Sequence, residues 1–416
     1  MGQHGHLMNC RARVRGAGGR LSMAVCPGGR GMRRGRAAAA LIAVLGLEHG
    51  AAWGQCSYSF VPAPDPHPSS FIGFFPTSIG EDGVVGGFIT TEPDIPAFWE
   101  PGVGLFVLPR PSGSTERVAV WDVLNREAMV GGMADTVPIF WRNGQWEVLP
   151  APEGRGLASG INRHLQIVGD VSGTNMDGLS TPDIPALWDN GQYVELPMPD
   201  GATRARATHI NDHGLIAGWA QFEGGLNDNK IVVWRHRQPE ILGSIPGGIA
   251  IRPSGLSNDG TIVGSDWDPA QLGNRPFVWM NGTFGLLPEP DGSLSGAARD
   301  VSDGRQTIGS VQTPAGQLLG VLWQHGQMYD LSALNVDGFS ISEARAINDN
   351  GVIVVAGGVL VPIGPAPGDV DYDCRVNVTD LLLLLAEWGN EGSFADVTDD
   401  GVVNHWDLIE LLINWG

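Results

Sequence analysis

Two patterns of apolar and polar positions alternate along residues 55–362. In the first, an apolar residue is followed by Asn, Ser or Gly, a polar pair, Gly, and a β-branched run that ends in Gly, as in Ile210–Gly218 and Leu256–Gly264. Short β-branched runs bounded by Gly-containing turns predict strands rather than helices. Copies of the pattern start at Ile79, Leu124, Ile161, Ile210, Leu256, Val301 and Ile347.

The second pattern leads from an apolar pair through Trp and a polar turn with Gly to a strand that ends in Leu-Pro. Phe140–Pro150 and Leu187–Pro197 are two copies, and their Asn-Gly pairs predict tight hairpins because both residues accept positive φ. Each repeat therefore holds about four short strands. One such sheet cannot bury both of its faces, so radial stacking into a β-propeller is expected. The Trp positions are 99, 141, 188, 234, 279 and 323.

The number of blades follows from the length of the repeat region. Residues 55–362 divide into seven units of 44 residues, with seven Gly-ending motifs but six Trp motifs. The missing half-repeat lies at the other end, where Tyr58–Asp65 is similar to Tyr193–Asp200. We therefore expect the N-terminal strand to complete the last blade of a seven-bladed ring, with six blades as the alternative.

These repeats resemble the HAF-type extracellular repeats of secreted bacterial proteins, over roughly residues 75–362. The resemblance implies an extracellular location and a propeller-like fold, and no established activity.

The periodic Trp residues fit two interpretations, a core position between blades or a platform that stacks on sugar rings. Because each follows apolar residues, the core is favoured. The non-periodic Trp146, Trp219 and Trp267 are better candidates for surface contacts.

Two acidic loops follow a Pro- and Gly-rich linker at residues 363–367. They are Asp369–Asp380 and Asp396–Asp407, with oxygen side chains at loop positions 1, 3, 5, 9 and 12 and a backbone carbonyl available at position 7. This is the spacing of an EF-hand calcium loop, and it predicts two Ca²⁺ sites. A leucine-rich helix is expected after each loop, with stripes of Leu381, Leu384, Leu385 and Trp388, and of Leu408, Leu411, Leu412 and Trp415. Because so small a module has a marginal core, calcium is expected to be needed for its folding.

The paired loops, with Asp at position 12, resemble a type I dockerin over residues 368–416. The resemblance implies the ligands Asp369, Asp371, Asp373, Arg375 (carbonyl), Asn377 and Asp380, and Asp396, Thr398, Asp400, Val402 (carbonyl), Asn404 and Asp407. Cys374 stands where Gly is usual at position 6, so strain is expected in the turn of the first loop. Thr398 replaces Asp or Asn at position 3, so the second site is expected to be weaker. The implied partner is a cohesin module, bound through Val378 and Thr379 or through His405 and Trp406. These two pairs differ, which favours a single binding face.

The first 54 residues predict a secretory signal. Arg33, Arg34 and Arg36 precede an 11-residue apolar run, too short to span a bilayer, and small residues flank a cleavage position after Gly54. Counted from Met32 to Gly54, the signal peptide has a normal length, so we interpret Met32 as the true start of translation. The expected product is secreted or envelope-bound, without a transmembrane span, and Cys56 and Cys374 can form one disulfide or remain separate.

Charge and motifs limit the possible functions. Removing residues 1–54, which carry +7, from a chain of net charge −20 leaves −27, which excludes nucleic acid as a partner. No nucleophile elbow, zinc helix or phosphate-binding loop is present, so no catalytic residue is predicted. The leading hypothesis is a non-catalytic scaffold docked through its tail. The alternatives are a carbohydrate-active propeller, either a lectin or a polysaccharide-acting glycosidase or lyase, and a structural envelope protein.

The predicted fold class is therefore mainly β. A six- or seven-bladed propeller spans residues 55–362, and a small α-helical, paired EF-hand-like calcium module follows at residues 368–416.

Overall fold

A computed structural model describes most of the chain after residue 55. Its described residues belong to one compact unit, Ala52–Gly416. They are residues 56–64, 73–111, 115–133, 137–152, 155–172, 183–223, 228–363, 367–371, 376–391, 393–398 and 400–415. The predicted signal segment and its start at Met32 lie outside them.

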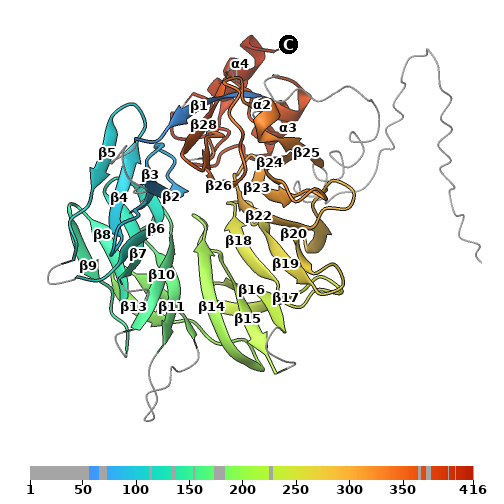
Figure 1. The fold of residues 1–416 in the computed structure, drawn as a ribbon. Coiled ribbons are helices and arrows are strands. Elements are labelled where there is room, and N and C mark those ends of the chain that lie inside the picture. The colour runs from blue at the N-terminus through green and yellow to red at the C-terminus, as the bar shows by residue number, and fades with distance from the viewer. Residues whose placement is uncertain are drawn as a thin grey trace, which may run out of the picture. The chain divides into compact units, whose positions relative to one another are not determined.

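Seven four-stranded antiparallel sheets follow one another around a ring (Figure 1), which confirms the propeller and selects seven blades over six. Blades 1 to 3 consist of β2 (Phe74–Ile79), β3 (Val85–Ile89), β4 (Ile95–Glu100) and β5 (Gly104–Val107); β6 (Val118–Asn125), β7 (Ala128–Met133), β8 (Val137–Arg142) and β9 (Gln145–Val148); and β10 (Arg155–Ile161), β11 (Ile167–Ser172), β12 (Ile184–Asp189) and β13 (Gln192–Glu195).

Blades 4 to 6 have the same order of strands. They consist of β14 (Ala202–Ile210), β15 (Ile216–Phe222), β16 (Asn229–Arg235) and β17 (Gln238–Gly243); β18 (Arg252–Leu256), β19 (Ile262–Asp268), β20 (Gly273–Met280) and β21 (Thr283–Leu286); and β22 (Ser295–Val301), β23 (Thr307–Gln312), β24 (Leu318–Gln324) and β25 (Gln327–Asp330). A short helix, α2 (Leu331–Leu334), follows β25.

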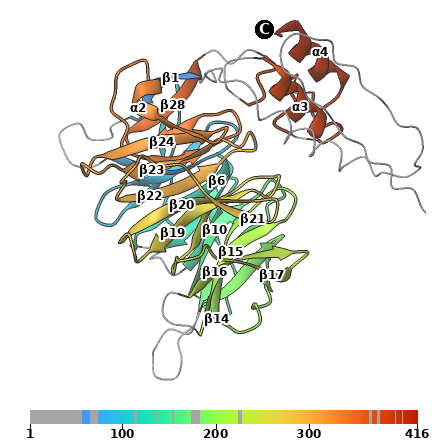
Figure 2. The same cartoon turned by 90° about the vertical axis from the view of Figure 1, so that its right-hand side faces the viewer.

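The seventh blade joins the two ends of the ring. β26 (Ala344–Ile347), β27 (Ile353–Val355) and β28 (Gly358–Ile363) are completed by β1 (Ser57–Pro62), which pairs antiparallel with β28 (Figure 2). This confirms the closure expected from the likeness of Tyr58–Asp65 to Tyr193–Asp200. Tyr58 is fully buried in this blade, and Cys56 beside it is disulfide-bonded. The other cysteines, Cys374 included, lie outside the described residues.

The first strand of each blade lies nearest the axis of the ring. Residues from all seven first strands line a central cavity of about 190 Å³. The Gly-containing motif follows each first strand, so the seven motif turns gather at one end of the ring, and the starts of the first strands lie at the other end.

Hydrogen bonds between motif turns link neighbouring blades. From blade 3 to blade 1, the third residue of each motif donates its backbone N–H to the side chain of the third residue of the next: Arg163 to Asp212, Asp212 to Asn258, Asn258 to Asp303, Asp303 to Asp349 and Asp349 to Glu81. The repeated polar pair of the sequence motif therefore joins the blades.

Asn211, the second residue of its motif, links blades 4 and 5 by a further hydrogen bond. Its buried side chain donates to the Ser257 carbonyl at 3.0 Å and accepts from the backbone N–H groups of His213 and Leu215. We expect Asn211→Ala to lower the free energy of unfolding by about 3 kcal/mol, because it leaves buried backbone groups without partners. Asn211→Asp keeps the acceptor and should cost less. Urea unfolding followed by circular dichroism measures both, and equal stability of Asn211→Ala and the parent would contradict the role.

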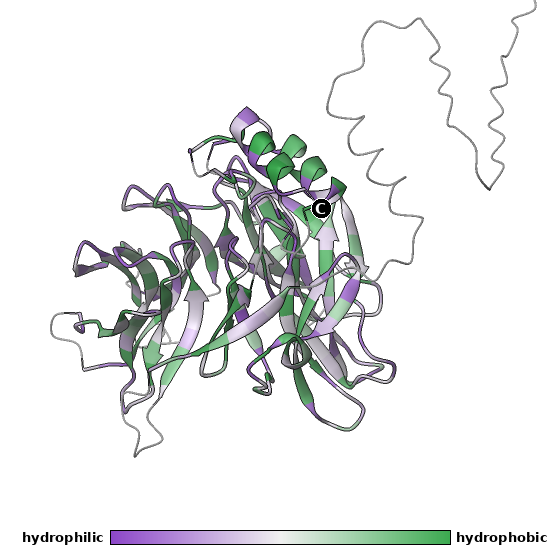
Figure 3. Cartoon of the chain, turned by 90° about the horizontal axis from the view of Figure 1, so that it is seen from above, coloured by the Kyte–Doolittle hydropathy of each residue, from purple (hydrophilic) through white to green (hydrophobic). Residues whose placement is uncertain are grey.

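The periodic Trp residues lie in the hydrophobic core. Trp188 and Trp234 are fully buried, and their indole N–H groups donate to the carbonyls of Pro150 and Pro197 in the preceding blade at 2.7 and 2.9 Å. The Leu-Pro end of one repeat is thus the hydrogen-bond partner of the Trp in the next. Figure 3 shows the apolar colour along strands throughout the ring.

Trp219 contradicts the surface interpretation. It is only 3% exposed, because arginine side chains cover its ring, whereas Trp267 is 36% exposed. Trp146 is half-buried and donates to the Pro109 carbonyl. Non-periodicity therefore does not mark a surface Trp in this fold.

Candidate metal centre

The C-terminal tail contains two helices, each beginning directly after an acidic loop. They are α3 (Val378–Ala386) and α4 (His405–Ile413). Asn377 and Asn404 cap them, and Asp380 and Asp407 accept from the cap residues' backbone N–H groups, so each helix starts with a capping box. Loop positions 9 and 12 therefore fix the helix start as well as the loop.

The two helices pack together (Figure 2) around a small core of Val370, Val376, Leu384, Ala395, Val403 and Leu411. Gly368, at φ +97°, lies so close to Leu411 that a Cβ atom would stand 2.6 Å from the Leu411 Cα. The tail therefore needs glycine at its first residue, where the chain packs against α4.

Half of each predicted apolar stripe lies outside this core. Leu385, Trp388, Leu412 and Trp415 are 48%, 45%, 53% and 45% exposed. The stripes are therefore only partly buried, because two short helices cover only the faces that contain Leu384 and Leu411.

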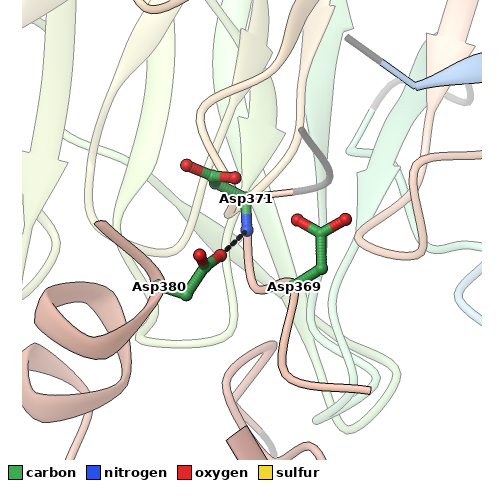
Figure 4. Close-up of side chains that lie close together, drawn as sticks. All are labelled: Asp369, Asp371 and Asp380. Atoms are coloured by element: carbon green, nitrogen blue, oxygen red, sulfur yellow. Dashed lines mark hydrogen bonds between the residues drawn. The ribbon is translucent and has the colours of Figure 1, made fainter. Parts of the chain in front are cut away.

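Three carboxylates of the first loop meet in a buried cluster. Asp369, Asp371 and Asp380 are 5%, 1% and 0% exposed, and each can place an oxygen within 4.8 Å of the others (Figure 4). Asp380 holds the loop closed, accepting from the backbone N–H groups of Val370 at 2.7 Å and Asp371 at 3.2 Å. A cluster of carboxylate oxygens suits a hard cation such as Ca²⁺.

The electrostatics of this cluster favour the binding of a cation. Burial, and after it the charge of Asp371, raise the pKa of Asp380 to about 7, although backbone hydrogen bonds oppose the shift. Carboxylates crowded in this way repel one another unless a cation or protons neutralise them. A divalent cation at the cluster removes that repulsion.

The second loop is more open. Asp396, Asp400 and Asp407 also place oxygens within 4.8 Å of one another, but Asp400 is exposed. Burial raises the pKa of Asp407, and hydrogen bonds from Asn404 and Thr398 more than offset it, so this pKa lies below its ordinary value. The Thr398 hydroxyl donates to Asp407 at 2.9 Å and supplies no charge of its own.

The remaining sequence-predicted ligands have other placements. Asp373 and Arg375 lie outside the described residues. The side-chain oxygens of Asn377 and Asn404 accept from the backbone of Thr379 and Trp406 as helix caps. The Val402 carbonyl accepts from the Asn404 side chain at 2.9 Å. The structure thus gathers six of the predicted carboxylates in two clusters of three.

One partner of the first loop could not be foreseen from the sequence. His325, in the turn between β24 and β25, places Nε2 3.0 Å from a carboxylate oxygen of Asp371, and Gln324 donates to the Asp371 carbonyl. His325 and Gln324 lie 46 and 47 positions before Asp371, and no local pattern signals these contacts.

Residues 367–414 match the family model of the dockerin type I domain. The tail is a dockerin type I domain. This identity implies calcium-dependent docking to a cohesin module, and such domains are typical of extracellular or cell-surface proteins. The resemblance of the preceding repeats to the HAF type stays a prediction.

Solved structures resemble the propeller at low identity. The β-propeller domain of the trilobed protease from Pyrococcus furiosus is 12% identical, covering 63% of this chain and 98% of its own, with a TM-score of 0.37. Virginiamycin B lyase from Staphylococcus aureus, in an inactive variant with quinupristin, is 11% identical, covering 73% and 97%, with a TM-score of 0.40. The designed protein Ika8 is 17% identical, covering 74% and 100%, with a TM-score of 0.40. Likenesses this distant carry no inference about function.

Among curated proteins, no sequence matches this chain. Within the described residues, no helix has the length and apolar character that a membrane crossing requires.

Proposed function

We propose that the protein is a secreted, non-catalytic scaffold or binding protein that its dockerin domain attaches to a cohesin-bearing partner in the presence of calcium. The buried cluster of Asp369, Asp371 and Asp380 is the observation that supports this most strongly, since a bound cation would relieve the repulsion between its carboxylates. The signal-like segment at residues 32–54 supports secretion.

We further propose that the cohesin binds the α4 side of the dockerin domain. Four large apolar side chains of α4 are exposed to solvent. They are Trp406, Ile409, Leu412 and Ile413, at 55%, 43%, 53% and 70%. On α3, Val378 and Leu385 are 50% and 48% exposed. Large exposed apolar patches mark interaction surfaces, and buried Trp side chains dominate the energy of many interfaces.

The difference between the two helices gives a direct test with matched variants. Trp406→Ala should weaken binding to the cognate cohesin about 30-fold or more, whereas Val378→Ala should change it less than about 3-fold. Both variants replace an exposed residue in the first turn of a helix. Titration calorimetry of the full chain with purified cohesin modules, in calcium and in chelator, measures the effect.

Each outcome of this titration decides one part of the proposal. A larger loss for Val378→Ala would move the binding face to α3. Absence of binding to every cohesin module in calcium, with the tail folded by circular dichroism, would contradict docking itself.

A further inference from the structure

Arginines collect along the first strands of the propeller, most of them toward the end opposite the motif turns. Six of the seven first strands carry an arginine within them or just before them. Those that lie no farther along than the middle of a strand are Arg117, Arg155, Arg204, Arg206 and Arg252, whereas Arg299 and Arg345 lie two residues before the first residue of their motif. The chain after residue 54 has only 16 arginines and one lysine, so these seven arginines are a concentrated exception in an acidic protein. We call this set the arginine mouth.

Carboxylates only partly neutralise the arginine mouth. Asp94 pairs with Arg117, Glu343 with Arg299 and Arg345, and Asp183 with Arg204 and Arg206; Asp170 lies 3.6 Å from Arg206. Asp94, Asp170, Asp183 and Glu343 are thus interleaved with these arginines. Asp94 and Asp183 occupy the repeated Pro-Asp-Ile-Pro-Ala sequence, which places them just before β4 and β12.

Aromatic rings hold several of these arginines in place. The guanidinium carbon of Arg252 lies 4.4 Å from the centre of the Trp219 ring, and that of Arg204 lies 5.4 Å from it. Arg345 stacks on Phe75 at 3.9 Å and Arg117 on Phe88 at 5.4 Å. Stacking fixes the plane of a guanidinium group and leaves its N–H donors directed outward, so the donors are preorganised.

Arg252 is the most informative member. It is exposed, and among the described residues it forms no ion pair. Partial burial, followed by the charges of Arg206 and Arg204, lowers its pKa from the ordinary value. A bound anion would relieve this repulsion, and a planar carboxylate matches the paired donors of a guanidinium group.

We propose that the arginine mouth binds an oligosaccharide that carries uronic acid carboxylates. The guanidinium groups bind the carboxylates, and the interleaved Asp94, Asp170, Asp183 and Glu343 accept hydrogen bonds from sugar hydroxyls. A ligand with charge alone, such as a polyphosphate, gains nothing from those four acids and is repelled by them. This binding function goes beyond the docking function and does not depend on it.

Calorimetry of the full chain with trigalacturonate tests the proposal. Arg252→Gln and Arg204→Gln should each weaken binding about 10-fold or more, because each removes a preorganised charged donor. Arg235→Gln is the matched control, since Arg235 is equally exposed but lies at the β16–β17 turn at the other end of the ring, and it should change the affinity less than about 2-fold.

Two further arms of the titration separate the sources of affinity. The methyl ester of the same trisaccharide, which lacks the charges, should bind at least about 10-fold more weakly. Inorganic phosphate should not compete at equal concentration. No binding of trigalacturonate, equal losses in Arg235→Gln, or equal binding of phosphate would each overturn the proposal; thermal unfolding confirms that the variants are folded.

Discussion

Replacement of Asp380 by Ala should remove the first calcium site and prevent the dockerin domain from folding around it. Asp380 is fully buried and accepts three backbone N–H groups besides facing Asp371, so both the loop and the start of α3 depend on it. Because the affinity of a calcium loop depends on its count of charged ligands, calcium affinity should fall on the order of 100-fold or more. Calorimetric calcium titration, with Trp fluorescence of the tail as a second readout, measures this.

Companion variants separate metal binding from helix capping. Asp380→Asn keeps an oxygen acceptor for the cap but removes the charge, and it should still lose most of the calcium affinity of the first site. Thr398→Asp should strengthen the second site, since it adds a charge where the hydroxyl now donates to Asp407. If Asp380→Asn bound calcium as tightly as the parent, the carboxylate would serve only as a helix cap.

Replacement of Trp234 by Ala should lower the free energy of unfolding of the propeller by about 3–5 kcal/mol, the usual cost of removing a buried Trp. Trp234 is fully buried between blades 3 and 4, in a cluster with Leu187, Leu196 and Ile216. The variant leaves a cavity and an unpaired carbonyl at Pro197, which now accepts from the indole at 2.9 Å.

Trp234→Phe fills part of the cavity and should cost an intermediate amount. Trp267→Ala, at a position that is 36% exposed, should cost about 1 kcal/mol or less. Urea unfolding followed by circular dichroism ranks the three variants. A mild effect of Trp234→Ala, combined with a loss of sugar binding, would instead favour the stacking interpretation of the periodic Trp residues.

Repetition made the fold predictable from the sequence. Each motif encodes a strand, a turn and a strand, and seven copies define seven blades once Tyr58–Asp65 supplies the missing half-repeat. The dockerin loops could also be predicted from the sequence. The spacing of Asn377 and Asp380 fits both a calcium loop and the capping box of α3. Local sequence patterns predict a contact when the interacting residues lie close together in the sequence, as they do within each calcium loop.

Contacts between blades were not predictable in the same way. Trp219 looked like a surface residue, yet Arg204 and Arg252 cover it from two different blades. The arginine mouth and the contact of His325 with Asp371 likewise join residues from separate repeats. The exposed halves of the helix stripes were missed because helical periodicity marks apolar faces without showing what covers them.

The most direct measurement of the central claim is capture of partners from the host's secreted and envelope fractions. The full chain and its Asp380→Ala variant serve as baits, each in calcium and in chelator, and captured proteins are identified by mass spectrometry. We expect the parent to capture a protein with a cohesin module in calcium only, and the variant to capture none. Capture of the same protein by the variant, or by the parent in chelator, would contradict calcium-dependent docking through the dockerin domain.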